Sequence, residues 1–150
     1  MQLTKPVKVK KARKPIRKTR RQKYEGVPTD KRLDDLARFL CHKRARCEAQ
    51  GFKGHVCNGG YQWCHVIPRE YKRNGLRWRA DNCLLMCSGA HFRWTKKNQV
   101  EWREFLYWKL GLEKVLRLEA EAIDGEKLTA PMRMDIQGSL IRSHMSKAGW

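Results

Sequence analysis

The order of secondary structure is clearest in residues 61–97, which read YQWCHVIPREYKRNGLRWRADNCLLMCSGAHFRWTKK. A short apolar run over 61–67 and a second over 82–87 predict two strands. The segment between them is polar and basic, so it is predicted to be a loop. A Ser-Gly turn with a possible helix cap follows the second run, and helical composition begins after it. The stretch therefore predicts strand, loop, strand, turn and helix, a small ββα unit in an α+β protein.

Helices are predicted on both sides of this unit. Before it, Thr29 or Asp30 can cap a helix whose apolar side chains recur at i, i+3, i+4, i+7 and i+8. Those side chains are Leu33, Leu36, Ala37, Leu40 and Cys41. After the unit, helical spacing is clearest over 100–110, a glycine interrupts it, and a second helix is predicted over 112–123. A short final helix is predicted around 140–141.

The chain has 150 residues, a length that indicates one domain. Its formal net charge of +19 indicates a polyanionic partner. Residues 1–24 contain eleven Lys and Arg and no acid, whereas the remaining residues have a net charge of +8. This first segment has two prolines and no helical or strand period, so we expect a disordered basic arm over 1–28. We expect a central domain with its N-terminal helix over 29–123 and a C-terminal helical extension over 124–150.

The arm is expected to neutralise DNA phosphates without choosing a sequence. The residues expected to do so are Lys10, Lys11, Arg13, Lys14, Arg17, Lys18, Arg20 and Arg21. The alternative is a tail that aids solubility or binds RNA non-specifically. No apolar run approaches the ~20 residues of a membrane span, and no apolar segment follows the first charges as in a secretory signal. We therefore expect a soluble cytoplasmic protein with no membrane partner.

The six cysteines favour a metal over disulfides, because the sequence predicts an intracellular protein. Cys47 and Cys57 bracket a glycine-rich loop, and Cys83 and Cys87 face the same way along a strand because side chains alternate. These four thiols predict a structural zinc site. No Cys-x-x-Cys pair is present, so the alternative is that they are small buried apolar side chains.

Three further side chains occupy the ends of the predicted elements. His65 lies at the end of the first strand, Asn82 at the start of the second, and His91 at the turn into the helix. A ββα unit brings these positions onto one surface, whereas any single histidine here would more often be structural.

With these residues in place, the stretch from Cys47 to Asn98 resembles the HNH endonucleases, also called His-Me finger or ββα-metal nucleases, and most of all those of bacteriophages and prophages. The resemblance lies in CHVIPR at 64–69, LRWRADN at 76–82 and LMCSGAH at 85–91. It implies metal-dependent hydrolysis of phosphodiester bonds in double-stranded DNA, for DNA processing, recombination or homing in a bacterial or phage-infected cell. Nicking is expected first, and double-strand cleavage would need a homodimer, two events or a phage protein partner.

The resemblance also implies a role for each residue. His65 matches the general base that deprotonates the attacking water. Asn82 matches the residue that orients the base or lies close to the catalytic ion. His91 matches the ligand of one divalent ion, Mg²⁺ or Mn²⁺, which stabilises the departing 3′ oxygen.

Two positions depart from the family pattern. Cys64 stands where many members have an Asp or His ligand, and a soft thiol suits Mg²⁺ poorly. Three alternatives follow: His91, Asn82 and water or substrate oxygens hold the ion, the ion is softer, or Cys64 faces the core. Ala90 stands where relatives often have a zinc-binding Cys, so Cys83 would take its place, with His55 as the weaker candidate.

The loop between the strands is expected to border the substrate groove. Its basic residues, expected to contact phosphates, are Arg69, Lys72, Arg73, Arg77 and Arg79. The rival function, from another class, is a non-catalytic zinc-containing nucleic-acid-binding module on the same ββα scaffold. A third possibility is that the protein mainly binds RNA or a ribonucleoprotein through its arm.

Overall fold

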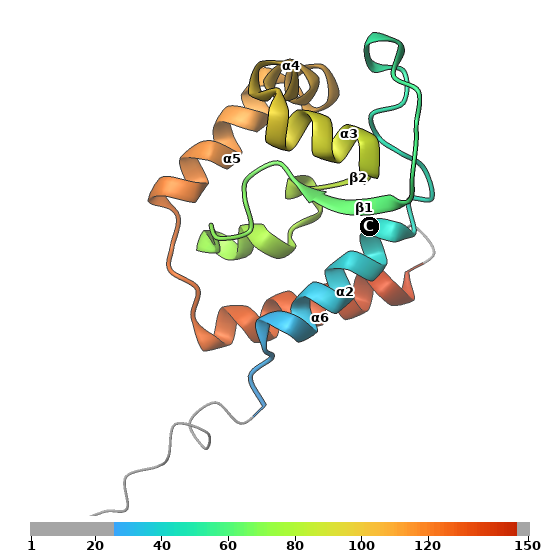
Figure 1. The fold of residues 1–150 in the computed structure, drawn as a ribbon. Coiled ribbons are helices and arrows are strands. Elements are labelled where there is room, and N and C mark those ends of the chain that lie inside the picture. The colour runs from blue at the N-terminus through green and yellow to red at the C-terminus, as the bar shows by residue number, and fades with distance from the viewer. Residues whose placement is uncertain (1–25, 147–150) are drawn as a thin grey trace, which may run out of the picture.

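The computed structural model describes residues 26–146 (Figure 1). The eight arm residues expected to bind DNA, Lys10 to Arg21, lie outside the described residues. Within them the protein is α+β, with one two-stranded antiparallel sheet and a majority of helical residues. The predicted fold class is therefore confirmed at this level.

The two predicted strands form one antiparallel pair. Strand β1 spans Tyr61–His65 and strand β2 spans Cys83–Cys87, with Tyr61 opposite Cys87 and His65 opposite Cys83. The pair is followed at once by the short helix α3, Ser88–Phe92, and by a π-helical turn, Arg93–Lys97. The predicted order of strand, loop, strand and helix is thus observed, except that Ser88 and Gly89, predicted as a turn, already belong to α3.

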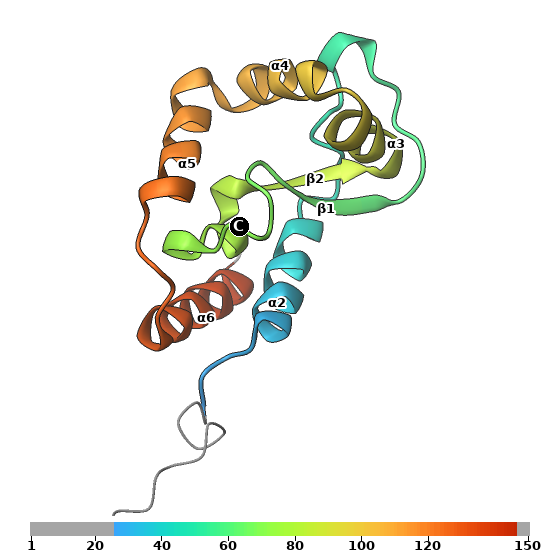
Figure 2. The same cartoon turned by 60° about the vertical axis from the view of Figure 1, so that its left-hand side comes forward.

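The sheet is covered on both faces, because side chains alternate along each strand. On one face Trp63, Cys83 and Leu85 pack against Cys41 of helix α2, which spans Asp30–His42. On the other face Cys64, Leu84 and Met86 join the main core, together with Ala90, Trp94, Trp102 and Phe105. Figure 2 shows α2 on one side of the strands and α3 on the other.

Helix α2 forms where the apolar spacing predicted it. Thr29 is its cap, accepting a hydrogen bond from the Arg32 amide at 3.3 Å. Leu33, Ala37 and Leu40 are fully buried on its inner face. Asp34, on the same inner face, is only 8% exposed, an unusual position for a carboxylate.

The C-terminal part is more regular than the sequence predicts. Helix α4 spans Gln99–Leu110 and α5 spans Leu112–Asp124, as predicted within a residue or so. The final helix, α6, spans Ala130–Met145 and is 16 residues long, so the prediction of a short helix around 140–141 was wrong. Its start is set by the Thr129 cap and a proline in the first turn, and only its Leu140 is fully buried.

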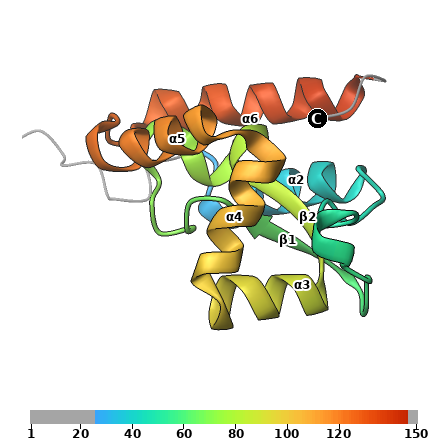
Figure 3. The same cartoon turned by 90° about the horizontal axis from the view of Figure 1, so that it is seen from above.

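Helices α2 and α6 lie side by side and run in the same direction (Figures 1 and 3). Near their starts Arg133 pairs with Asp30 at 2.6 Å, and near their ends the Lys43 ammonium donates to the His144 carbonyl at 3.0 Å. Leu140 packs into the cluster of Leu33, Ala37, Leu40 and Trp78. Among residues 26–146, no helix combines the length and apolar character needed to cross a membrane.

Candidate functional site

A group of four metal-ligand side chains lies where the glycine-rich loop meets the end of β2. The ligand atoms of Cys47, His55, Cys57 and Cys87 are all within 4.8 Å of one another. The Nε2 atom of His55 is 3.2 Å from the Cys87 sulfur, and the Cys87 amide donates to the Cys47 sulfur at 3.1 Å. This Cys3His group could therefore hold a metal.

The donors fit Zn²⁺, which takes three thiolates and one imidazole in tetrahedral sites whose ligand atoms are ~3.8 Å apart. Burial opposes ionisation of Cys87, but amide hydrogen bonds, first from Ala90 and then from Asn58, outweigh it and lower the pKa of its thiol. The Ala90 amide lies 3.4 Å from the sulfur, because Cys87 is also the cap of α3. These bonds favour the thiolate that a metal requires.

Cys83 does not belong to this group, so that part of the predicted zinc set was wrong and His55 takes its place. Cys83 and Cys87 are four residues apart on one strand, which separates them by ~13 Å even when they face the same way. Cys83 is 1% exposed among Cys41, Leu85 and Trp63, and burial raises the pKa of its thiol. It is the small buried apolar side chain of the alternative interpretation.

Cys64 also faces the core. It is 1% exposed, and burial raises the pKa of its thiol. Of the three alternatives for this residue, the core position is confirmed. A thiol held there offers no ligand to an ion beside His65.

His65, at the end of β1, is held as a neutral imidazole. Its Nε2 lies 3.0 Å from the Arg77 carbonyl oxygen, which can only accept, so Nε2 bears the proton and Nδ1 keeps its lone pair. The pKa of His65 is lowered to about 4, mainly by burial and also by the charges of Arg69 and Arg77, against the hydrogen bond to the Arg77 carbonyl and the charge of Asp34. A histidine in this state can accept a proton at neutral pH.

His91, on α3, is fixed in the opposite tautomer by a chain of hydrogen bonds. The Ser88 hydroxyl donates to the Gly60 carbonyl at 2.8 Å and lies 3.2 Å from the Gln62 amide nitrogen. The Gln62 oxygen therefore faces His91 Nδ1, at 2.6 Å, and accepts a hydrogen bond from the Nδ1–H group. Nε2 is left with a lone pair, as in many histidines that bind metals. Burial lowers the pKa of His91, and the charge of Lys96 adds to this effect.

Both histidines line one pocket of about 630 Å³ beside β1, together with exposed polar and charged side chains. Those side chains include Arg69, Glu70, Lys96 and Gln99. The sequence interpretation passed over Lys96, although it follows His91 by five residues, and it gave Gln62 and Glu70 no role. The only sequence signal for a role of Lys96, Gln62 and Glu70 was that each lies within five residues of His65 or His91.

Asn82 is not in this pocket. It is fully buried, its Oδ1 accepts from the Ile67 amide at 2.7 Å, and its Nδ2 donates to the carbonyls of Ile67 and Leu76 at 3.2 and 3.0 Å. The prediction that Asn82 helps to hold the catalytic ion was therefore wrong, because both polar atoms of its side chain bind the backbone. These bonds join the two ends of the loop after β1.

Replacing Asn82 by Ala is expected to lower the free energy of unfolding by about 3 kcal/mol, because three backbone groups lose their partner in a dry site. Urea unfolding measures the change as a lower midpoint with an unchanged slope. The matched control is Asn98→Ala, which removes an exposed cap of α4 and should cost about 1 kcal/mol. A cost at Asn82 no larger than that at Asn98 would contradict the buried role.

Four of the five cations of the loop between the strands bind partners within the protein. Arg77 pairs with Asp34, Lys72 with Asp30 at 2.6 Å, and Arg79 with Asp81 and Glu121. The Arg73 guanidinium donates to the Gly125 carbonyl at 2.7 Å. These four side chains thus have partners within the protein, and the expectation that they contact phosphates stays a prediction. Arg69 alone among the five predicted residues is exposed and lines the pocket.

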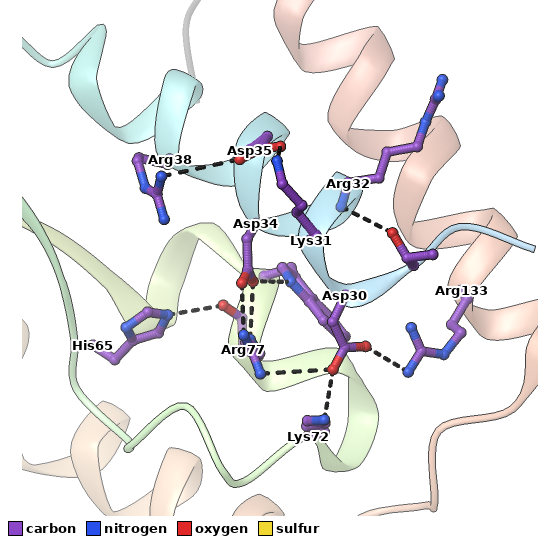
Figure 4. A network of polar contacts seen from close by, with 12 residues as sticks. Asp30, Lys31, Arg32, Asp34, Asp35, Arg38, His65, Lys72, Arg77 and Arg133 are labelled. Carbon is purple, nitrogen blue, oxygen red and sulfur yellow. Dashed lines mark hydrogen bonds and ion pairs between the residues drawn. The ribbon is translucent and has the colours of Figure 1, made fainter.

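The loop cations therefore anchor the loop to α2 and to the helices that follow the sheet. Figure 4 shows Asp30 between Lys72, Arg77 and Arg133, and Asp34 beside Arg77. The left-handed turn at Gly75, with φ of 68°, lets the loop pass against Ile136 of α6, where a Cβ would meet that side chain at 2.5 Å.

Comparisons with protein-family models, with curated proteins and with solved structures find no match to this chain.

Proposed function

We propose that the protein is a metal-dependent endonuclease of the HNH type, which nicks or cleaves DNA by hydrolysing phosphodiester bonds. The supporting observation is that His65 and His91 line one pocket, each with one ring nitrogen fixed by an acceptor and the other left with a lone pair. The β1–β2–α3 order around them supports a His-Me finger core.

In this proposal His65 Nδ1 removes a proton from the attacking water. The Arg77 carbonyl fixes the tautomer, and burial keeps the ring neutral and ready to accept the proton. In-line attack on the phosphorus leaves a 5′ phosphate and a 3′ hydroxyl. The general base is thus supplied by the end of β1, which the pairing of His65 with Cys83 fixes to the sheet.

The resemblance implies a divalent ion, Mg²⁺ or Mn²⁺, and the pocket offers few protein ligands for it. Among residues 26–146, the Cys3His group is the one set of three or more such side chains with ligand atoms close together. His91 and Glu70 are lining residues that could supply ligands, and so few protein ligands fit an ion that keeps water and takes phosphate oxygens. When bound, the ion would stabilise negative charge on the departing oxygen.

Duplex DNA is the proposed substrate because of the charge. Arg69 and Lys96 line the pocket, and the chain as a whole has a net charge of +19. Cations that make contact with phosphates release counterions and supply affinity independent of sequence. A setting in phage DNA processing, recombination or homing, with a homodimer or phage protein partner for double-strand cuts, is part of the same proposal.

The test is supercoiled plasmid incubated with the full-length protein and Mg²⁺, Mn²⁺, Co²⁺ or Ni²⁺ in turn. Nicked circles are expected before linear DNA, and end-labelling should find 5′ phosphates. Binding to the same plasmid is measured in parallel by gel shift. DNA that is bound but left intact with every metal would sink the enzyme proposal and favour the zinc-containing nucleic-acid-binding module, while binding to RNA alone would exclude both DNA functions.

A further inference from the structure

The backbone carbonyl that orients His65 belongs to Arg77, whose side chain is itself held in place. The Arg77 guanidinium donates from Nε to Asp34 Oδ1 at 2.9 Å and from Nη2 to Asp34 Oδ2 at 2.6 Å. Such a two-pronged pair fixes direction as well as distance. The Arg77 side chain is 15% exposed and the Asp34 side chain is 12% exposed, so water competes little for either partner.

The next residue is held by the same carboxylate. The Trp78 indole donates from Nε1 to Asp34 Oδ1 at 2.8 Å, and its ring is 1% exposed. Asp34 therefore binds two consecutive loop residues with three hydrogen bonds. The Arg77 carbonyl belongs to the peptide bond that joins these two anchored residues, so its direction toward His65 depends on both. Figure 4 shows this carbonyl facing His65 and the Arg77 side chain beside Asp34.

Asp34 lies on α2, outside the β1–β2–α3 unit, and α2 is fixed from several sides. Leu33 precedes Asp34, Ala37 follows it by three residues, and both are fully buried in one cluster with Trp78 and Leu140. Asp30, one turn earlier, binds Lys72 of the same loop and Arg133 of α6. Because α2 is fixed in this way, its carboxylates can hold Lys72, Arg77 and Trp78 of the loop in fixed positions.

We propose that Asp34 is a positioning residue for the general base, acting on His65 through the side chain and backbone carbonyl of Arg77. This inference rests on the proposed endonuclease function and adds to it a requirement for a helix outside the ββα unit. Asp34 does not reach the pocket or the reacting atoms. Its effect is to fix the tautomer and direction of the His65 ring.

The test is Asp34→Asn, which keeps an oxygen for Trp78 but turns one prong toward Arg77 into a donor. We expect kcat for plasmid nicking to fall about 10- to 100-fold with KM changed by less than about twofold, the size expected of a misplaced catalytic group. Nitrogen NMR of labelled histidines should show the Nε2-protonated form of His65 dominant in the wild type and reduced in the variant. The matched control is Asp35→Asn, on the exposed side of α2, which should leave kcat and tautomer unchanged.

The pH dependence of kcat for plasmid nicking is a third measurement that tests the role of Asp34. The charged groups that act on the His65 ring are Arg69, Arg77 and Asp34. Asp34 raises the pKa of His65, so its neutralisation should lower that pKa and shift the acid limb of kcat to lower pH. A role confined to packing would lower the melting temperature without moving the tautomer or the limb.

A second variant covers the case in which Asp34→Asn does not fold. Arg77→Lys keeps the backbone carbonyl and the positive charge but cannot form two parallel bonds, so it should weaken the same tautomer preference. Its control is Arg103→Lys, at an exposed two-pronged pair with Glu119 on α4 and α5. A folded Asp34→Asn protein with wild-type tautomer and kcat would overturn the positioning role. If the wild type does not cut DNA, the endonuclease proposal fails, and the NMR reading still decides the role of Asp34.

Discussion

Replacing Cys87 by Ala is expected to prevent zinc binding at the Cys3His group and to abolish cooperative unfolding of the chain. Structural zinc sites contribute an apparent 10–16 kcal/mol at neutral pH, which is as large as the whole stability of a typical domain. Residues 47–60 contain only a short 3-10 turn, Phe52–Gly54, and three of the four ligands lie in this segment. Phe52 of that turn packs on Trp94 and Phe105, so its release would open the main core.

The measurement is zinc per chain by elemental analysis together with thermal unfolding followed by circular dichroism. The wild type should hold one zinc, and a strong chelator should produce the same loss of structure as the substitution. Cys83→Ala is the matched control, because it removes a buried thiol from the same strand outside the group. It should keep one zinc and cost only about 1 kcal/mol. Zinc lost from Cys83→Ala but retained in His55→Ala would contradict the ligand set.

Replacing His65 by Ala is expected to lower the nicking rate by about 10²- to 10⁴-fold, the usual contribution of a general base. His65 does not belong to the Cys3His group and makes no side-chain hydrogen bond to Asn82, so the metal content and the fold should be retained. His42→Ala is the matched control, since His42 is exposed at the end of α2, and it should cut at the wild-type rate. An unchanged rate in His65→Ala would exclude the residue as the base.

The pH dependence of the wild type follows from the same ring. A general base works in its neutral form, and burial lowers the pKa of His65 to about 4. The rate is therefore expected to stay level as the pH falls from 8 to about 6 and to decline only at lower pH, whereas an ordinary histidine would lose activity near 6.5. Zinc content measured at each pH separates this decline from loss of the structural metal, whose ligands also bind protons in acid.

The parts of the fold that the sequence predicts are those set by local pattern. The spacing of Leu33, Ala37 and Leu40 predicts α2, and two short apolar runs predict the strands, because each pattern matches one backbone period. Helix α6 was underestimated for the same reason: only Leu140 is buried on it, so its apolar spacing is weak. Its cap at Thr129 was a signal that the prediction did not use.

The sequence predicted which residues belong to the candidate site but not which of their side chains contact one another. His65 and His91 line one pocket as expected, but alternation along a strand gives the face of a side chain and not its distance from another. That is why Cys83 was included in the zinc set and His55 was ranked below it. The charges of Arg77 and Arg79 were visible in the sequence, whereas their partners Asp34 and Glu121 lie 43 and 42 residues away. Such pairings depend on tertiary packing.

Because α2 pairs with α6, the packing around α2 is completed only after α6 has been synthesised. Contacts between Lys43 and His144 and between Arg133 and Pro28 join residues 101 and 105 positions apart. Helix α2 is made early, but part of its inner face stays uncovered until the 16 residues of α6 have emerged from the ribosome. Because α2 positions the loop beside His65, an unfinished chain lacks a properly oriented imidazole. A protein proposed to cut DNA would thus be expected to acquire its activity only after α6 has been synthesised and has packed against α2.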